Sequence, residues 1–189
     1  MKTVHEWLGE KLRYDDVEES LGKALSFYGD KYGEIILSSD ISLLLNDKKA
    51  KKALGTFCAE TNEITLNQVK GLLGSKQLDC VFVHEMAHFL DHERRSRNSR
   101  YRFASSQFGK KERVIADLFR SKMIPVPQKR TNYRGRTCEL FARAIEEYYG
   151  LLTENKNWIR EFCSFDYYVN ITDFKKVLFP VIQNYFMEI

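Results

Sequence analysis

The sequence predicts a mostly helical α+β domain that carries a small sheet beside one buried helix. The 189-residue chain is long enough for a single domain with a substantial core, and its 43% hydrophobic and 30% charged composition is typical of a globular protein. Most of its apolar residues recur at helical spacing over long segments. Residues 55–67, by contrast, combine β-branched and aromatic residues around a polar centre, which favours strands.

The N-terminal part predicts helices around one short strand. The apolar positions of residues 3–28 indicate one or two helices, with a break at Asp15-Asp16. Residues 34–38 follow Gly33 and favour a short strand. Ser39 or Asp40 is a good N-cap, so a further helix is expected from there, through a solvated lysine-rich face, to Leu54.

Residues 55–67 predict two strands joined by a polar turn at Glu60 to Glu63. A strand with a free edge at this point could pair with an extended peptide through main-chain hydrogen bonds. The same strands could equally be no more than the end of the core sheet. Gly71 and Gly74 predict a flexible loop between this hairpin and the next helix.

The next helix contains the pattern His84-Glu85-Met86-Ala87-His88. Residues four apart lie on the same face of a helix, so His84 and His88 can both reach one metal ion. Glu85 lies next to the first ligand, where its carboxylate can take a proton from a metal-bound water. Two such histidines can also be structural, but burying them with a carboxylate and without a partner would be costly. The pattern therefore predicts a zinc site on a largely buried helix.

A second acidic helix, predicted from Thr137 to Gly150, is the expected source of the third ligand. A catalytic zinc takes three protein ligands and leaves one position for water. Glu139 is the first choice because it lies between apolar residues near the buried start of this helix. Glu146 lies on nearly the same face and is the second choice, whereas Glu147 points elsewhere.

Several other side chains could assist the reaction. On a continuous helix His92 lies about 12 Å along the axis from His84, so it could reach the same ion only if the helix broke. Asp91 could orient a ligand or pair with an arginine, or it could lie simply at the surface. The candidates for orienting a ligand or stabilising an oxyanion are Asp91, His92, Arg143, Glu146 and Tyr148, with Tyr133 and Tyr149 as further oxyanion donors.

The segment from Arg94 to Arg136 is strongly basic, with 14 lysines or arginines against two acids, Glu112 and Asp117. Basic residues interleaved with aromatic ones suit contacts with nucleic acid, and they suit an acidic protein partner equally well. A solvated surface is the ordinary explanation of such a run. The candidate polyanion-binding residues are Arg94, Arg95, Arg97, Arg100 and Arg102.

The remaining segments predict scaffold. Residues 112–123 favour a helix ended by two prolines, and residues 128–136 favour a loop. A further helix is expected from Thr172, kinked or split at Pro180, with its aromatic residues in the core. The four widely spaced cysteines predict free thiols. No run approaches the roughly 18 apolar residues of a membrane span, and the N-terminus lacks the apolar core of a signal peptide, so a cytoplasmic protein without membrane contact is expected.

These residues resemble a known family. His84-Glu85-Met86-Ala87-His88 followed by a Glu-bearing helix looks like the gluzincin branch of the zincin metallopeptidases. Residues 83–91 and 139–148 resemble the zincin-like domains of large polyvalent proteins in phages and conjugative elements, and residues 55–67 are similar to the segment that precedes the metal helix there. The resemblance covers about residues 55–150, and the basic insertion is longer and more charged than that pattern requires.

The resemblance implies a zincin-like fold, zinc held by His84, His88 and Glu139, and Glu85 as the base in the hydrolysis of a protein or peptide substrate. Which substrate is cleaved does not carry over, because such domains are assigned mostly by motif. Two other hypotheses come from different classes. One is a SprT-like protease whose basic segment, residues 94–136, docks on nucleic acid. The other is a zincin fold that has lost catalysis and serves as a binding module.

Overall fold

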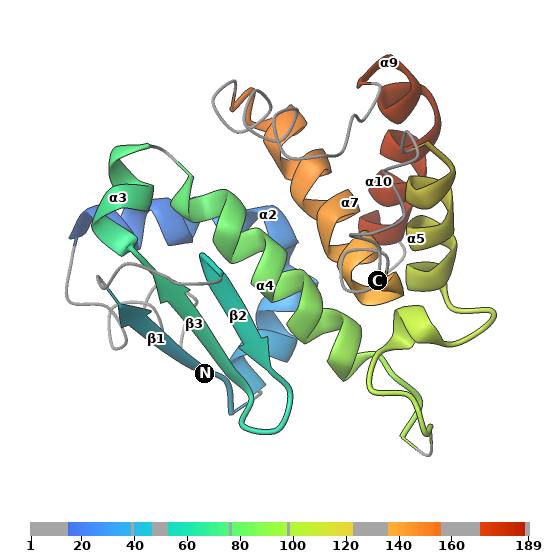
Figure 1. Cartoon of the computed structure of the whole chain (residues 1–189), viewed down its shortest axis with the longest axis horizontal. Coiled ribbons are helices and arrows are strands. Elements are labelled where there is room, and N and C mark those ends of the chain that lie inside the picture. Colours follow the sequence, from blue (N-terminus) through green and yellow to red (C-terminus); the bar gives the residue numbers. More distant parts are fainter. Residues whose placement is uncertain are drawn as a thin grey trace. The chain divides into compact units, whose positions relative to one another are not determined.

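The computed structural model describes residues 15–38, 40–46, 53–75, 77–97, 99–122, 136–155 and 171–187. These residues are mostly helical and include one three-stranded sheet, which confirms the predicted α+β class (Figure 1). The chain divides into two compact units, Met1–Met86 and Ala87–Ile189, and helix α4, Leu78–Glu93, runs through the division. Each unit contains its own set of buried apolar side chains.

The sheet of the first unit has the strand order β1-β3-β2. Strands β2, Gly55–Cys58, and β3, Glu63–Asn67, form the predicted antiparallel hairpin. Its polar turn includes Asn62, which has a positive φ of 54°, a conformation that asparagine tolerates better than most residues. Strand β1, Ser42–Asn46, pairs in parallel with the other side of β3, so β2 is an edge strand within the described part of the sheet.

Strand β1 shows that the helix predicted over residues 40–54 is wrong. In the parallel register Leu43 lies opposite the buried Ile64 of β3, whereas Leu44 is exposed on the other face. Three consecutive leucines favour a helix by propensity, but pairing with β3 satisfies the backbone groups of this segment and overrides that preference. Residues 47–52, the lysine-rich remainder of the predicted helix, lie outside the described residues.

Helix α2, Asp15–Ser38, contradicts the strand predicted at residues 34–38. The helix predicted up to Tyr28 is present from Asp15, and the chain then breaks at Gly29, whose φ of 68° and ψ of 178° are accessible mainly to glycine. Beyond the break the chain resumes a helix, because a short apolar run is compatible with either structure. Residues 3–14, and with them the chain before the predicted break at Asp15-Asp16, lie outside the described part.

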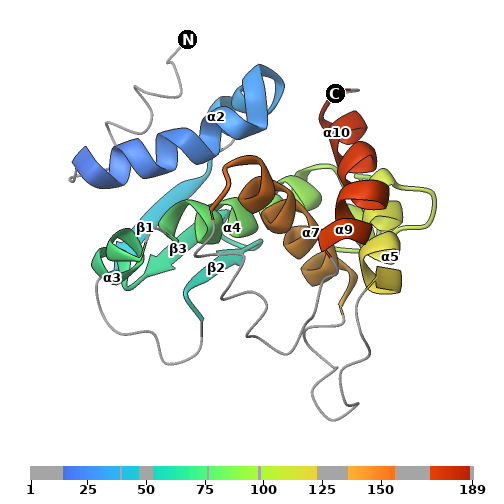
Figure 2. The same cartoon turned by 90° about the horizontal axis from the view of Figure 1, so that it is seen from above.

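Two helices follow the hairpin. Gly71 and Gly74 belong to a short helix, α3, Val69–Gly74, and not to the predicted flexible loop, because burial of Val69 and Leu72 holds this segment against the core. Tyr28 of α2 donates a hydrogen bond to the carbonyl oxygen of Val83 in α4 at 2.5 Å. Figure 2 shows α2 beside α3 and the first half of α4.

The second unit is a group of helices around α7, Thr137–Leu152. Helix α5, Lys111–Lys122, packs against α7, and the C-terminal helix α10, Phe179–Met187, packs against both. The predicted helices 112–123 and 137–150 are thus present, although α7 continues past Gly150. A short 3-10 helix, η1, Ala104–Ser106, lies before α5. Residues 123–135, which contain the predicted proline stop and most of the predicted loop, lie outside the described residues.

The C-terminal helix is irregular where proline was expected to disturb it. Helix α9, Ile171–Asp173, passes into a π turn, η3, Phe174–Leu178, directly before α10, in which Pro180 is the second residue. Phe174 and Tyr185 are buried, which confirms the prediction that these aromatic residues belong to the core. Residues 156–170 lie outside the described part.

Among the described helices, none combines the length and the hydrophobicity needed to span a membrane. Cys58, Cys80 and Cys138 are free thiols, as predicted, and Cys163 lies outside the described residues.

Candidate metal centre

Helix α4 carries two histidines one helical turn apart. No glycine or proline interrupts the helix, and the side chains around the two histidines, such as Phe82, Met86 and Phe89, are fully buried. His84 is half-buried and His88 is buried. Because residues four apart lie above one another, both imidazoles belong to one face of α4.

Glu139, in the first turn of α7, is buried against His88. Its Oε1 atom lies 3.3 Å from Nε2 of His88, and the ligand atoms of His84, His88 and Glu139 all lie within 4.8 Å of one another. Two ligand atoms that are about 2.0–2.1 Å from a tetrahedral ion are about 3.3–3.5 Å apart. The distance between His88 and Glu139 therefore suits two ligands of one ion.

The chemistry of this group also fits a metal ion. Two imidazole nitrogens and one carboxylate oxygen are a donor set that zinc accepts. Glu139 is only 4% exposed, and a bound cation would offset the cost of burying its carboxylate as a charge. The group formed by His84, His88 and Glu139, called the metal group below, could therefore hold an ion.

Glu85 follows His84 on α4 and is 5% exposed. Strand β2 covers it: a Cβ atom built on Gly55 would lie 2.7 Å from both Cγ and Oε1 of Glu85. The small sheet thus lies beside the helix with the His-Glu-x-x-His pattern, as the predicted fold required. The Glu85 carboxylate is enclosed between the start of β2 and α4.

The alternative ligands are not part of the metal group. Glu146 and Glu147 are both buried on α7, and burial, together with the neighbouring Glu146, raises the pKa of Glu147 to about 8. Nδ1 of His92 lies 2.9 Å from the carbonyl oxygen of Arg102. Burial lowers the pKa of His92, which favours a neutral ring whose Nδ1–H donates this hydrogen bond. His92 therefore fastens the basic segment to the end of α4.

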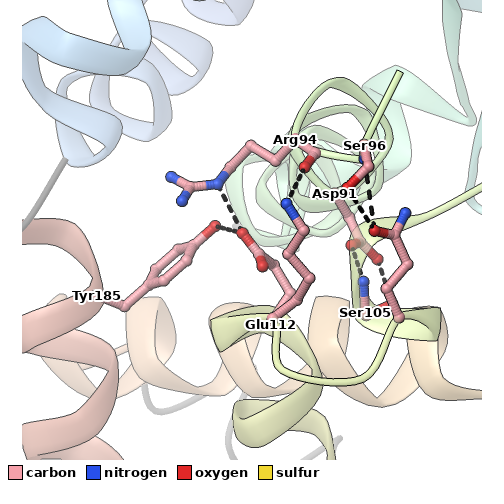
Figure 3. A network of polar contacts seen from close by, with 8 residues as sticks. Asp91, Arg94, Ser96, Ser105, Glu112 and Tyr185 are labelled. Atoms are coloured by element: carbon pink, nitrogen blue, oxygen red, sulfur yellow. Dashed lines mark hydrogen bonds and ion pairs between the residues drawn. The ribbon is translucent and has the colours of Figure 1, made fainter. Parts of the chain in front are cut away.

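Asp91 is buried and does not lie at the surface. It accepts hydrogen bonds from the backbone N–H of Ser105 at 2.7 Å and from the Ser105 hydroxyl at 2.6 Å, so its partner is a serine and not an arginine (Figure 3). Burial raises the pKa of Asp91 to about 7, against the opposing effect of these hydrogen bonds. Asp91 therefore anchors Ser105, which follows the five candidate arginines in the chain, to α4.

The arginines of the basic segment have two different environments. Nε of Arg94 lies 2.6 Å from the buried carboxylate of Glu112, which also accepts a hydrogen bond from the Tyr185 hydroxyl at 3.0 Å (Figure 3). Arg95 donates to the carbonyl oxygen of His92 at 2.6 Å. Arg94 therefore pairs with a buried acid of α5, and Arg95 caps a carbonyl group near the end of α4. The side chains that face solvent are those of Arg97, Arg100 and Arg102.

Three remaining candidates, Arg143, Tyr148 and Tyr149, lie on α7. Tyr148 is buried against Phe179, with ring centroids 4.5 Å apart, and burial raises its pKa. This environment is that of a packed core residue. Arg143 is half-buried, Tyr149 is fully buried, and Tyr133 lies outside the described residues.

No protein-family model, curated protein or solved structure matches the chain. The resemblance to zincin metallopeptidases therefore stays a prediction made from the motif.

Sequence reasoning missed two features of this region. The approach of Gly55 to Glu85 joins residues far apart in the chain, and no local pattern signals it. The pairing of Glu112 with Arg94 did have a signal, because Glu112 is one of two acids among 14 basic residues. A lone buried acid in such a segment is expected to bind one of the neighbouring arginines.

Proposed function

We propose that the protein is a zinc-dependent metallopeptidase. The observation that carries the proposal is the metal group, in which donor atoms of His84, His88 and Glu139 lie within 4.8 Å of one another. Glu85, which is buried, directly follows the first of these ligands in the sequence of the same helix. Two histidines, a downstream glutamate and an adjacent carboxylate are the parts that hydrolysis assisted by zinc requires.

His84, His88 and Glu139 would hold the ion, which when bound polarises a carbonyl group and lowers the pKa of water. Glu85 then acts as the general base: its carboxylate takes a proton from the attacking water and later delivers it to the leaving amine. Because Glu85 is nearly enclosed, bulk water competes little for this proton.

The edge of β2 favours a peptide as the substrate. The N–H of Asn67 donates to the carbonyl oxygen of Leu54 at 2.8 Å, so Leu54 faces β3. In an antiparallel pair this direction alternates, so Gly55 directs its N–H and C=O groups to the opposite edge. An extended peptide can pair with these groups and be held beside Glu85.

Zinc content tests the ligands. Purified wild type is expected to contain about one zinc per chain, and Glu139→Ala is expected to lose most of it, because a missing ligand weakens a three-ligand site. Glu146→Ala, a matched change of a buried acid on the same helix, should keep the metal. Full zinc in Glu139→Ala and loss in Glu146→Ala would move the third ligand to Glu146. A wild type without zinc, even after reconstitution, would favour the binding-module hypothesis.

Turnover tests the base. Glu85→Gln should retain zinc and lower kcat on a cleavable peptide by about 10² to 10⁴-fold, the usual contribution of general base catalysis. Glu93→Gln changes an exposed acid at the end of the same helix and should leave kcat unaltered. Wild-type turnover in Glu85→Gln would remove Glu85 from the mechanism.

A second candidate is a peptidase that acts on proteins bound to nucleic acid, and the exposure of Arg97, Arg100 and Arg102 favours it. Replacing these three arginines by glutamine should weaken binding to DNA and reduce its dependence on salt concentration. If the variant binds DNA as tightly as the wild type, or if the wild type binds no DNA at low salt, the proposal of a peptidase that does not act on nucleic acid remains.

A further inference from the structure

The first residue of β2 has no room for a side chain. A Cβ atom at Gly55 would lie 2.7 Å from Cγ and Oε1 of Glu85 and 2.9 Å from Cγ1 of Val81. Real Cβ atoms essentially never approach other heavy atoms so closely. The backbone of β2 at this point therefore lies directly on the carboxylate side chain of Glu85.

The backbone conformation does not explain this glycine. Gly29 and Gly109 have a positive φ, whereas Gly55 belongs to a regular strand whose conformation other residues adopt. An alanine at position 55 would thus fit the strand, and the atoms nearest to its methyl group would be side-chain atoms of Glu85 and Val81. That methyl group would have to displace Cγ and Oε1 of Glu85 together with Cγ1 of Val81, so the Glu85 carboxylate would leave its present position.

Among the described residues no strand pairs with the outer edge of β2, and Gly55 faces that edge. By the alternation described above, Gly55 directs its N–H and C=O groups away from β3. The close contact therefore brings the Glu85 carboxylate next to the first edge group with which an extended peptide would pair.

We infer that Gly55 is a positioning residue, whose missing side chain lets the Glu85 carboxylate sit against the substrate-binding edge of β2. The inference rests on the proposed peptidase function. The glycine touches the base, and the base acts on the substrate. A displacement of about 1 Å in a catalytic group can cost about 10²-fold in rate.

The first test compares Gly55→Ala with Gly71→Ala. Gly55→Ala is expected to keep its zinc and a KM within about twofold of wild type while kcat falls about 10- to 100-fold. Gly71 has no atom within 4 Å of an added Cβ, so Gly71→Ala should keep the wild-type kcat. If the wild type cleaves peptide and Gly55→Ala cleaves it equally fast, the inference is wrong although the peptidase proposal stands.

The second test asks whether Gly55 acts through Glu85. Aspartate at position 85 is shorter by one methylene and avoids the added methyl group, so Glu85→Asp should reduce kcat less in the Gly55→Ala background than in wild type. Equal reductions in both backgrounds would contradict the inference. A crystal structure of Gly55→Ala gives a readout that does not depend on activity. A rotated Glu85 side chain supports the inference, and an unmoved one overturns it even in a protein without turnover.

Discussion

The hydrogen bond between Ser105 and Asp91 should stabilise the protein more at high pH than at low pH. Replacing Ser105 by alanine removes the hydroxyl donor, which lies 2.6 Å from Oδ2 of Asp91, and leaves the backbone donor in place. Both residues are fully buried, so no water replaces the lost donor without a rearrangement of the loop. The free energy of unfolding must therefore fall.

The size of the loss depends on the charge of Asp91. Burial raises the pKa of Asp91 from 3.8 to about 7, so the folded protein holds this proton at pH 5.5 and has released it at pH 8.5. A neutral hydrogen bond contributes about 1 kcal/mol and one to a charged group about 1.5–3 kcal/mol. Ser105→Ala should thus cost about 1 kcal/mol at pH 5.5 and about 2–3 kcal/mol at pH 8.5. The difference corresponds to a rise of about one unit in the pKa of Asp91 in the variant.

In the wild type the raised pKa of Asp91 makes the folded protein less stable as the pH rises. Between about pH 4 and pH 7 the folded state keeps a proton that the unfolded state has lost, so this group's contribution to stability falls as the pH rises through that window. The shift amounts to about 4 kcal/mol over the whole window, at about 1.4 kcal/mol for each pKa unit.

Urea unfolding at pH 5.5 and pH 8.5, with a chelator present so that metal binding does not contribute, measures this difference. Ser121→Ala is the matched control, because the Ser121 hydroxyl donates to the Leu118 carbonyl oxygen on an exposed part of α5. Its effect should stay within about 0.5 kcal/mol at both pH values. An equal loss for Ser105→Ala at the two pH values would refute the reasoning about the charge of Asp91.

Three further predictions concern stability. Glu147→Gln should stabilise the protein relative to wild type, and this stabilisation should grow by about 4 kcal/mol between pH 5 and pH 9, because a buried acid with a pKa of about 8 resists ionisation. Urea titrations across that range would show no such trend if Glu147 ionises freely. Arg94→Met should lower the free energy of unfolding by about 3 kcal/mol, because it leaves the Glu112 carboxylate buried without its cation, and adding Glu112→Gln should recover part of that loss. Tyr28→Phe should cost about 1 kcal/mol through the lost hydrogen bond to Val83, and an unaltered urea midpoint would argue against it.

The two helices of the site could be predicted because each carries a strong local signal. Helix α4 combines apolar flanks with the His-Glu-x-x-His spacing, and helix α7 begins where a run of helix formers starts. The proximity of Glu139 to His88 could be expected from the hypothesis of a metal site, since two histidines that bind a catalytic zinc need a third protein ligand. The apolar neighbours of Glu139 near the start of α7 were the local signal that favoured it over Glu146, and Glu139 is the residue that lies 3.3 Å from His88.

The errors fall where local preference and long-range pairing disagree. Leu43 to Leu45 favour a helix in isolation, but they form β1 because β3 offers a partner strand. Residues 34–38 favour a strand, yet they continue α2 beyond Gly29. The contact between Gly55 and Glu85 has the same origin, because a strand and a helix distant in sequence must pack before it exists. Such features follow from the assembled fold and not from any single segment.

The π turn before Pro180 acts as one residue inserted into the C-terminal helix. Proline has no N–H to donate and its ring would collide with the carbonyl group one turn earlier, whereas the wider turn Phe174–Leu178 ends with the N–H of Phe179 bonded to the carbonyl oxygen of Phe174. The extra residue of the π turn therefore accommodates the proline that follows it. A related chain that lacks one is expected to lack the other, so a gap in an alignment of this helix belongs between positions 174 and 178. There the length of the protein can change by one residue while Ile182 and Tyr185 keep their places in the core.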